Sequence, residues 1–457
     1  MGDDAFSVVG RQVVVVGAAR SGIAAAELLA RRGARVVLTE SRQTFDDAAR
    51  LRQAGVELEV GGHTSATFEN ADLIVVSPGV PTEQPVFDSA RRNGVEIIGE
   101  LELASRWVKG PIVAITGTKG KSTTTTLLGR MFAEDGRDVM VGGNIGVPLS
   151  AQVEASTPDT VHVVEVSSFQ LETTVTFRPW IALWLNFAAD HLDRHPDVGA
   201  YAAAKARVFA NQQATDWAVV NADDPTVMAR SRGIAAQRVM FSPSGDVSEG
   251  FFVDGDWIVK RTGTTLERLI PVSAVELTGR HMLNNVVAAA AVATVAGVPT
   301  RAMTHALRGF HGLEHVMEPV GRIGDVRFVN DSKATNVEAA RRSIDSFEGV
   351  VALVGGRFKG GDLRELRAPL AAHGRGVIAI GEAAPLVREA LQDVVPVVTA
   401  ASMREAVSHA YVAARPDGVV LLAPACASFD WFKDYAERGR VFKEEVERLR
   451  VQGTRER

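Results

Sequence analysis

The sequence is poor in cysteine, because Cys426 is the only one among its 457 residues. A disulfide framework within the chain is therefore excluded, and a reducing compartment fits. The beginning of the chain carries Asp3 and Asp4 and lacks the charged-then-apolar pattern of a secretion signal. The longest apolar stretch, around residues 286–296, is shorter than the ~18 residues needed to cross a bilayer. We therefore expect a cytoplasmic protein without a membrane span.

The sequence also lacks an excess of positive charge. Its net charge is -5 and its pI is about 6.1, which argues against non-specific nucleic-acid binding because that binding relies on a basic field. Hydrophobic residues make up 46% and charged residues 23% of the chain, as in globular proteins. There is no low-complexity tract and no short repeat. At roughly 150 residues per domain, the length predicts about three domains.

The predicted elements follow an α/β order throughout. In the first segment, a strand at Gln12–Val16 leads into a glycine turn and then into an alanine-rich helix at 23–32. The further predicted elements are strands at 35–39, 72–77, 112–116, 162–166, 181–185, 326–330, 350–354, 377–380 and 418–422, helices at 122–135, 201–209, 283–296, 336–346 and 403–414, and a hairpin at 241–264. Strand–turn–helix repeats of this kind predict parallel sheets with right-handed crossovers.

A glycine loop, Gly117-Thr-Lys-Gly-Lys-Ser-Thr123, stands between a predicted strand and a predicted helix. Such a loop brings backbone N–H groups and the helix N-terminus to phosphate oxygens. Lys121 supplies a point charge near the β/γ-phosphates, and Ser122 or Thr123 can place a hydroxyl on Mg²⁺. The usual loop has a glycine where this chain has Ile115, so this is a compact variant. It predicts an ATP-using enzyme.

A second glycine turn, Gly17 to Gly22, follows the first strand. With Glu40 as the ribose-binding acid, it could be a dinucleotide fingerprint. However, Ala19 occupies the second glycine position, where the backbone must approach a pyrophosphate closely. We therefore favour a nucleotide-sugar diphosphate at these strand ends over a nicotinamide cofactor.

Three polar patches in the second segment carry groups that can bind a metal ion. Glu165 opens the patch Glu165–Gln170 at a strand end, and His191 lies in the patch 186–193 after the next strand. Lys205 lies in the alanine-rich helix 201–209. Glu and His can both ligate Mg²⁺, which prefers oxygen. Taken one at a time, His191 is typical of a capped loop residue and Lys205 of a solvated helix face.

Together, the motifs resemble those of the Mur ligases, the ATP-dependent amide-bond-forming enzymes of peptidoglycan synthesis. The matching motifs are Gly117–Thr123, Gly142-Gly-Asn-Ile-Gly146, Glu165–Gln170, Asp190-His-Leu-Asp-Arg194 with Lys205, Asn330-Asp-Ser-Lys-Ala-Thr-Asn336, and Pro424-Ala-Cys-Ala-Ser-Phe-Asp430 with Glu437-Arg-Gly439. They span nearly the whole chain in the order of the family. Asn330–Asn336 and Pro424–Asp430 are the motifs most similar to the D-glutamate-adding type.

The resemblance implies an α/β fold of three domains. These are a Rossmann-like domain at 1–99 that binds the uridine diphosphate of the substrate, a P-loop-type ATPase domain at 100–312, and a Rossmann-like domain at 313–457 that binds D-glutamate and closes on ATP. It also implies a cytoplasmic monomer that adds D-glutamate to UDP-N-acetylmuramoyl-L-alanine. The L-alanyl carboxylate attacks the γ-phosphate of ATP to form an acyl phosphate. The amine of D-glutamate then displaces the phosphate.

The resemblance further assigns residues to roles. For ATP they are Gly117, Thr118, Lys119, Gly120, Lys121, Ser122, Thr123, Asn285, Asp331 and Lys333. For Mg²⁺, expected at two sites, they are Ser122, Glu165, His191 and Lys205, the last carbamylated by CO₂ so that a cation becomes an anion. For the nucleotide-sugar they are Arg20, Ser21, Ser41, Arg42, Gly79 and Asn144, and for D-glutamate Thr335, Lys359, Ser428 and Tyr435. Lys121, His191, Lys205 and Lys333 are the expected catalytic residues, whereas we interpret Cys426 as a packed residue and not a nucleophile.

The sequence departs from the family pattern at three positions. Met282 stands for an asparagine in the motif Gly279–Asn285, Val316 for an arginine that reaches the ATP phosphates in relatives, and Phe358 for an aspartate or glycine. Losing a phosphate-binding arginine weakens transition-state stabilisation by ~2–4 kcal/mol if nothing substitutes. Our hypothesis is that Arg308 or Arg322 compensates.

Four other functions are compatible with parts of the sequence. A Mur ligase adding L-alanine, a diamino acid or a dipeptide is disfavoured by Asn330–Asn336 and Pro424–Asp430. A folate polyglutamylating ligase would lack the first domain. A non-catalytic relative that binds the nucleotide-sugar is suggested by Met282 and Val316, but Lys121 and the metal-site residues argue against it. A dehydrogenase would require NAD binding.

Overall fold

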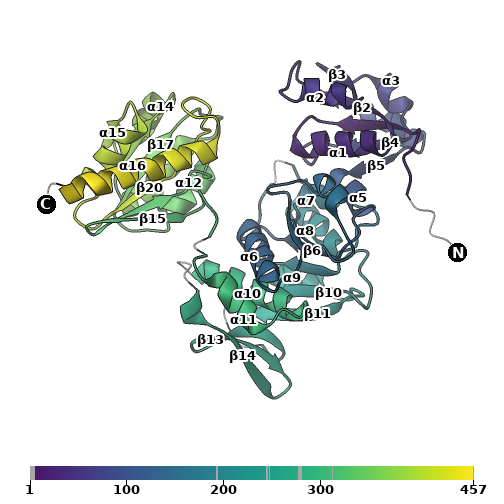
Figure 1. Cartoon of the computed structure of the whole chain (residues 1–457). Coiled ribbons are helices and arrows are strands. Elements are labelled where there is room, and N and C mark those ends of the chain that lie inside the picture. The colour runs from purple at the N-terminus through teal and green to yellow at the C-terminus, as the bar shows by residue number, and fades with distance from the viewer. Residues whose placement is uncertain are drawn as a thin grey trace. The chain divides into compact units, whose positions relative to one another are not determined.

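The computed structural model describes residues 6–191, 194–242, 245, 247–275, 280–310 and 312–455. The chain forms two compact units, the first spanning residues 1–310 and the second residues 311–457 (Figure 1). None of the helices in the described ranges has both the length and the apolar composition that a bilayer crossing requires. The predicted α/β fold class is confirmed, because parallel sheets dominate both units.

The first unit begins with a five-stranded parallel sheet in the order β3-β2-β1-β4-β5. Its strands are β1 (Gln12–Val16), β2 (Arg35–Glu40), β3 (Glu57–Val60), β4 (Leu73–Val76) and β5 (Glu96–Gly99), and its helices are α1 (Arg20–Arg31), α2 (Ala48–Gln53), α3 (Ser65–Glu69) and α4 (Val86–Arg92). Strand order reverses between β1 and β4. Such a switch point, at the carboxyl ends of the strands, is where open α/β sheets bind ligands.

A nine-stranded sheet forms the rest of the first unit, in the order β14-β13-β12-β11-β10-β9-β6-β8-β7. Its strands are β6 (Ile112–Thr116), β7 (Val139–Gly143), β8 (Val161–Glu165), β9 (Ile181–Trp184), β10 (Trp217–Asn221), β11 (Gln237–Ser242), β12 (Gly250–Asp254), β13 (Trp257–Thr262) and β14 (Thr265–Pro271). Strands β12 to β14 pair antiparallel, so the predicted hairpin at 241–264 is a three-stranded ribbon. Residues 243, 244 and 246 of that prediction lie outside the described residues.

Helices cover both faces of the nine-stranded sheet. They are α5 (Glu100–Ser105), α6 (Lys121–Glu134), α7 (Ser168–Glu172), α8 (Val198–Ala206), α9 (Pro225–Arg230), α10 (Arg280–Val295) and α11 (Thr300–Leu307). The helices α6, α10 and α11 share one apolar core with β6, β9 and β14. The opposite face packs against α5, α7 and the segment after α8. The strand order switches at β6, so the loop after β6 opens at the ligand-binding edge of the sheet.

The second unit contains a six-stranded sheet in the order β15-β16-β20-β17-β18-β19, parallel except for β15. Its elements are β15 (Glu318–Ile323), β16 (Val326–Asn330), α12 (Val337–Ile344), β17 (Val350–Gly355), α13 (Arg367–His373), β18 (Gly374–Ile380), α14 (Ala384–Leu391), β19 (Val397–Thr399), α15 (Met403–Ala414), β20 (Val419–Leu422) and α16 (Tyr435–Arg455). One face packs against α12 to α14 and the other against α15 and α16. The last strand, β20, enters between β16 and β17, so three loops meet at one edge.

Candidate active site

The glycine loop joins the buried strand β6 to helix α6, as the sequence predicts. Gly120 has the left-handed φ of 81° that the turn into the helix requires. Helix α6 begins at Lys121, and the first four N–H groups of a helix have no partner inside it. The backbone of this loop is therefore shaped to receive an anion at the helix N-terminus.

Two asparagines brace the glycine loop. The Asn186 side-chain oxygen accepts from the backbone N–H groups of Thr118 and Lys119 at 3.1 and 2.9 Å. The oxygen of Asn285, from helix α10, lies against Gly120, where a Cβ atom would come within 2.2 Å of it. Asn285 is buried, and its amide also donates to the Met282 sulfur at 3.7 Å. The sequence analysis assigns Asn285 to the ATP site but gives no role to Asn186.

Glu165 links the glycine loop to the loop after β7. Its carboxylate accepts from the Ser122 hydroxyl at 2.6 Å and from the Asn144 amide at 2.8 Å. The Asn144 backbone N–H also donates to the Glu165 carbonyl. The structure therefore places Ser122, Glu165 and Asn144 in one chain of hydrogen bonds. Hydroxyl and carboxylate oxygens are the ligands that Mg²⁺ prefers, so Ser122 and Glu165 fit a magnesium site.

Lys205 is a buried lysine beside the glycine loop. Its amine donates to the Gly117 carbonyl at 2.8 Å and lies 4.7 Å from the centre of the Tyr201 ring. Burial and the nearby positive charge of Lys121 lower the pKa of Lys205 to about 7, against the opposing effect of Asp190 and Glu165. About half of the amine is therefore neutral near pH 7. The sequence alone favoured a solvated position, and burial contradicts that interpretation.

His191 lies in a separate loop with a left-handed φ of 54°. Its ring contacts Phe169 at 5.1 Å and Tyr201 at 6.0 Å between ring centres. The Tyr201 ring also contacts the Lys205 amine, so Tyr201 connects His191 to Lys205. Among the described residues, no group of three or more His, Cys, Asp or Glu side chains is arranged to hold a metal ion. A magnesium site here would depend on the Ser122 hydroxyl and on a modified Lys205.

A cavity of about 200 Å³ opens at the carboxyl ends of β1, β4 and β7. Of the residues expected at the nucleotide-sugar, Arg20, Ser21, Gly79 and Asn144 line it. The Arg20 guanidinium donates to the Gly146 carbonyl at 3.2 Å. Gln170 also lines the cavity, and its buried Nε2 atom has no hydrogen-bond partner among the described residues. Gln170 is thus a candidate substrate contact; it belongs to the motif Glu165–Gln170, but the sequence analysis assigns it no role.

Ser41 and Arg42 do not line this cavity but surround the buried Glu40. The Glu40 carboxylate accepts from Ser41 Oγ, from the Arg42 backbone and guanidinium, and from the Ala18 N–H. Burial alone would raise the pKa of Glu40, but these hydrogen bonds, led by that of Arg42, lower it to about 2. Both carboxylate oxygens are occupied by the protein. Glu40 is therefore poorly placed to bind a ribose, which argues against the dinucleotide alternative.

In the second unit, the residues expected at D-glutamate come from loops at one sheet edge. Arg357 and Ala427 pair in an antiparallel bridge, which brings the segments of Lys359 and Ser428 together. The Ala425 N–H donates to the Ala334 carbonyl at 2.9 Å, which places the Thr335 segment beside them. Tyr435 begins α16, and its carbonyl accepts from Ser332 Oγ at 2.7 Å. The four predicted residues thus share one end of the sheet.

Asp331 and Lys333 follow β16 at the same edge. The Asp331 carboxylate accepts from the Met317 N–H at 3.2 Å and from the Ser343 hydroxyl, and burial raises its pKa. The backbone N–H of Lys333 donates to the His315 carbonyl at 3.0 Å, and its side chain is exposed. Cys426 is fully buried, and burial raises its pKa to about 11. Its thiol is therefore inert, as expected.

The departures from the family pattern have different structural consequences. Met282 is buried in the apolar core with β6 and α6, and its sulfur receives the Asn285 amide. Val316 is half-buried before β15, and Phe358 packs at the edge of the second unit's core. Gly279, which begins the motif containing Met282, lies outside the described residues. In the backbone register of the β15–β16 hairpin, Arg322 lies opposite Arg327 and Glu318 lies opposite Asn330. Arg322 is therefore about 13 Å along the strand from Glu318.

Comparison with known proteins gives matches over nearly the whole chain. Family models match in order: the N-terminal domain of MurD-like Mur ligases at residues 11–99, the Mur ligase middle domain at 115–293, and the Mur ligase glutamate ligase domain at 317–426. The UDP-N-acetylmuramoylalanine–D-glutamate ligase of Pelotomaculum thermopropionicum is 44% identical over 443 residues, covering 95% of this chain and 97% of that protein. The enzyme of the same name from Acidobacterium capsulatum is 45% identical over 444 residues, covering 96% of each.

Solved structures show the same architecture. The UDP-N-acetylmuramate-alanine ligase MurC of Thermotoga maritima is 17% identical, with a TM-score of 0.57 over 96% of this chain and 100% of that one. A pseudomurein peptide ligase type C from Methanothermus fervidus is 18% identical, with a TM-score of 0.55 and the same coverage of both chains. At these identities, the likeness is one of fold alone.

Proposed function

The chain belongs to the Mur ligase family, and we propose that it joins D-glutamate to the L-alanyl carboxylate of UDP-N-acetylmuramoyl-L-alanine, converting ATP to ADP and phosphate. One observation carries the proposal. The hydrogen bonds from Ser122 to Glu165 and from Asn144 to Glu165 connect the ATP loop directly to the cavity at the first sheet. A carboxylate bound in that cavity and the γ-phosphate of ATP would therefore meet at Glu165.

Phosphoryl transfer and amide formation follow in two steps. An oxygen of the L-alanyl carboxylate attacks the γ-phosphorus, and ADP leaves. The amine of D-glutamate then attacks the acyl carbon and loses a proton, and phosphate leaves with the oxygen that attacked first. Lys121 at the glycine loop would hold the phosphates, and Lys333 is the further cation that the family resemblance assigns to them. Positioning and charge stabilisation supply most of the catalysis in such reactions.

The metal-site residues fit Mg²⁺ by their chemistry. Ser122, Glu165, His191 and a carbamate on Lys205 would hold it, with two sites expected. When bound, Mg²⁺ neutralises charge on the reacting phosphate oxygens. Until it is modified, Lys205 is a poor neighbour for a cation when protonated. Its pKa of about 7 reflects burial first and the nearby positive charge of Lys121 second.

Carbamylation of Lys205 resolves this conflict of charge. The neutral amine attacks the carbon of CO₂, an N–C bond forms, and the amine proton is released. The product carries a carboxylate-like anion in place of a cation. Burial favours the neutral amine, the form that attacks CO₂, and a bound Mg²⁺ would offset the cost of burying the carbamate anion. No external enzyme is required for this step.

D-Glutamate would bind at the sheet edge of the second unit. The Lys359 ammonium suits the side-chain carboxylate, and the hydroxyls of Thr335 and Ser428 supply further polar contacts. Tyr435 has 38% of its surface exposed and could cover the bound amino acid. The proposal includes three domains, at 1–99, 100–312 and 313–457. It also includes a monomeric protein that acts in the cytoplasm. Closure of the last domain would exclude water from the acyl phosphate.

Phosphate release by the purified protein tests the proposal. With ATP, Mg²⁺ and UDP-N-acetylmuramoyl-L-alanine present, we expect release to depend on D-glutamate and not on L-glutamate, L-alanine or a diamino acid. Release without D-glutamate dependence would overturn the substrate assignment. An absence of turnover combined with tight binding of the nucleotide-sugar would indicate a non-catalytic relative.

A further inference from the structure

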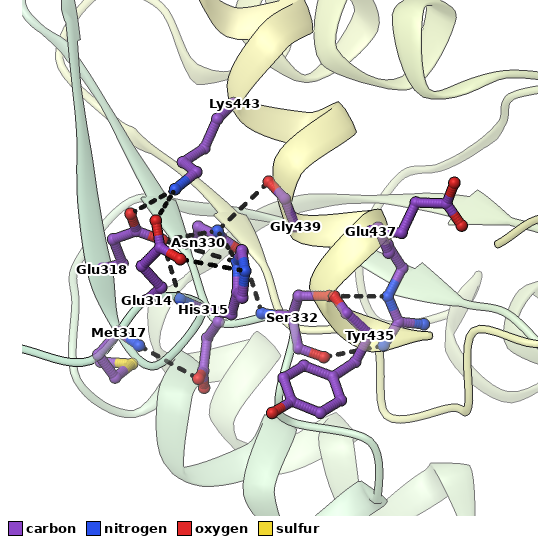
Figure 2. Close-up of polar contacts among 12 residues, drawn as sticks. Glu314, His315, Met317, Glu318, Asn330, Ser332, Tyr435, Glu437, Gly439 and Lys443 are labelled. Atoms are coloured by element: carbon purple, nitrogen blue, oxygen red, sulfur yellow. Dashed lines mark hydrogen bonds and ion pairs between the residues drawn. The ribbon is translucent and has the colours of Figure 1, made fainter. Parts of the chain in front are cut away.

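Helix α16 contains a glycine that helix propensity does not explain. Gly439 lies in its second turn, where glycine costs about 1 kcal/mol relative to alanine. A Cβ atom at this position would lie 2.2 Å from Nδ1 of His315 and within 2.9 Å of two other ring atoms. An imidazole from a loop 124 residues earlier therefore occupies the space that a side chain of α16 would fill (Figure 2).

His315 is held in place by its backbone as well as its ring. It is 3% exposed and has a left-handed φ of 65°, a conformation that costs a non-glycine residue about 1 kcal/mol or more. Its N–H donates to Glu318 Oε2 at 2.9 Å, and its carbonyl accepts from Lys333 at 3.0 Å. The surrounding contacts thus fix a conformation that the residue would not adopt alone.

Asn330 determines how the His315 ring is used. The Asn330 side-chain oxygen accepts from the Ser332 N–H at 3.1 Å, so its amide nitrogen faces the other way. That nitrogen donates to His315 Nδ1 at 2.9 Å, to Glu318 Oε2 at 2.8 Å and to the Gly439 carbonyl at 3.4 Å. Because an amide nitrogen can only donate, Nδ1 must be an acceptor and the ring neutral. Burial lowers the pKa of His315, in agreement with a neutral ring.

An ion-pair clamp closes the outer side of this junction. Lys443, one turn beyond Gly439 on α16, bonds to Glu314 at 3.0 Å and to Glu318 at 2.9 Å. Figure 2 shows Lys443 reaching from the helix toward both carboxylates. The ion pairs of Lys443 and the hydrogen bond from the Asn330 amide to the Gly439 carbonyl together hold α16 against residues 314–318.

Two predicted ligand-binding sites extend from opposite sides of His315. On one side, Met317 donates to the Asp331 carboxylate, which is expected at the ATP ribose. On the other, the His315 ring meets the Tyr435 ring edge-on at 6.2 Å, and Ser332 bonds to the Tyr435 carbonyl. A displacement of His315 would therefore act on Tyr435 through the ring and on Asp331 through the backbone that leads from His315 to Met317.

We propose that His315, seated against Gly439, is a positioning residue that sets Asp331 and Tyr435 jointly and so couples ATP binding to D-glutamate binding. The inference rests on the proposed function for the identity of the two ligands. Such coupling is reciprocal: bound ATP changes the affinity for D-glutamate by the same factor as bound D-glutamate changes the affinity for ATP. A displaced ring is expected to disturb both sites. The reacting groups are untouched by the displacement.

The experiment is a double-mutant cycle in the full-length chain, with KM for ATP and KM for D-glutamate measured separately. Gly439→Ala forces the imidazole out, and we expect both KM values to rise by about fivefold or more. In a His315→Ala background the added methyl group has space, so Gly439→Ala should cause less than about twofold further change. His315→Asn keeps an acceptor near the Nδ1 position and tolerates a left-handed φ, so it should lie closer to wild type than His315→Ala does.

His373→Ala serves as the control, because His373 lies at the end of α13 and its ring bonds to Glu348. Its KM values should match wild type. The proposal fails if the variants keep both wild-type KM values and lose only Vmax in proportion to their folded fraction, since that result indicates a purely structural role. Failure of wild type to use D-glutamate would instead refute the proposed function. If Gly439→Ala does not fold, the His315→Ala and His315→Asn pair decides the question.

Discussion

At the residue scale, the burial of Lys205 is the largest departure from what its own sequence segment predicts. Its helix is rich in alanine, which from sequence alone is typical of a solvated face. The structure buries the amine against Tyr201 and the Gly117 carbonyl. A periodicity argument has no means of detecting this, because the burial depends on packing against segments far away in the chain.

Carbamylation of Lys205 should make the activity of the protein depend on both pH and CO₂. The pKa of Lys205 is lowered to about 7 from 10.5 by burial, so the amine becomes neutral as pH rises through 7. We expect activity in CO₂-depleted buffer to be low and to rise on adding bicarbonate, more strongly at pH 8 than at pH 6. Carbamate formation can be followed by ¹³C NMR with labelled bicarbonate. Lys205→Gln should show neither response, and a bicarbonate-independent wild type would contradict the carbamate.

The lowered pKa of Lys205 also makes the free energy of unfolding depend on pH. Between pH 7 and 10.5 the unfolded state binds a proton at Lys205 that the folded state does not. The unmodified lysine therefore makes the folded state more stable as pH rises across that window, and its full destabilising effect is present below pH 7.

Contacts distant in sequence set the limit of prediction for single residues. The loops that carry Asp331, Thr335 and Ser428 could be recognised from their motifs. The contact of His315 with Gly439 could not, because it joins a loop to a helix across 124 residues and has no sequence periodicity. The same holds for the amide of Gln170, whose unpartnered position is visible only in the folded cavity.

At the scale of elements, the turn into α6 is fixed by Gly120 from two directions. Its φ is 81°, and a Cβ would lie 2.2 Å from the Asn285 oxygen. We expect Gly120→Ala to displace the phosphate loop and lower kcat/KM for ATP by about 100-fold. Adding Asn285→Gly should not restore wild-type activity, because the left-handed φ still costs alanine about 1–2 kcal/mol.

Gly136 provides the matched control for this prediction. It follows the same helix with a φ of 78°, and a Cβ there would meet nothing within 4 Å. Gly136→Ala should therefore lower the melting temperature slightly and leave kcat/KM for ATP unchanged. Equal kinetic loss in both variants would show that a general loss of stability, and not displacement of the glycine loop, accounts for the effect.

The β15–β16 hairpin bears on the missing arginine at Val316. The register places Arg322 opposite Arg327 and far from the Asn330 end, which argues against Arg322. The carbonyl of Arg308 accepts from Arg130 in the later half of α6, and compensation by Arg308 stays a prediction. We expect Arg308→Ala to lower kcat/KM for ATP by at least tenfold, about 1.4 kcal/mol, and Arg322→Ala to have little effect. Val316→Arg should then add little. A large gain from Val316→Arg would instead show that no other cation compensates.

Element prediction succeeded for many buried apolar strands, but it missed the buried central strand β10 and several strands at exposed sheet edges. Strands β1, β6, β16 and β17 were placed within a residue or two because they are runs of buried aliphatic residues. Strand β3, Glu57–Val60, and strand β14, Thr265–Pro271, were missed. Both alternate or mix charged residues with apolar ones at the edge of a sheet, so their pairing depends on a neighbour more than on their own composition.

At the scale of the whole molecule, the two units divide the chemistry. The glycine loop, where ATP is expected, and the cavity expected to hold the nucleotide-sugar belong to the first unit, and the expected amino-acid site belongs to the second. We expect the protein to act as a monomer, so light scattering after size exclusion should give a mass near 48.8 kDa with and without substrates. A dimeric mass that persists at assay concentration would contradict this.

The central claim is that ATP activates the substrate carboxylate as an acyl phosphate before the amine attacks. An ¹⁸O label in the L-alanyl carboxylate tests it most directly, with the phosphate product analysed by mass spectrometry after turnover with D-glutamate. The account predicts that each phosphate carries one oxygen from the carboxylate, so a fully labelled carboxylate gives singly labelled phosphate. Unlabelled phosphate accompanying amide formation would show that the oxygen never joined phosphorus and would contradict the mechanism.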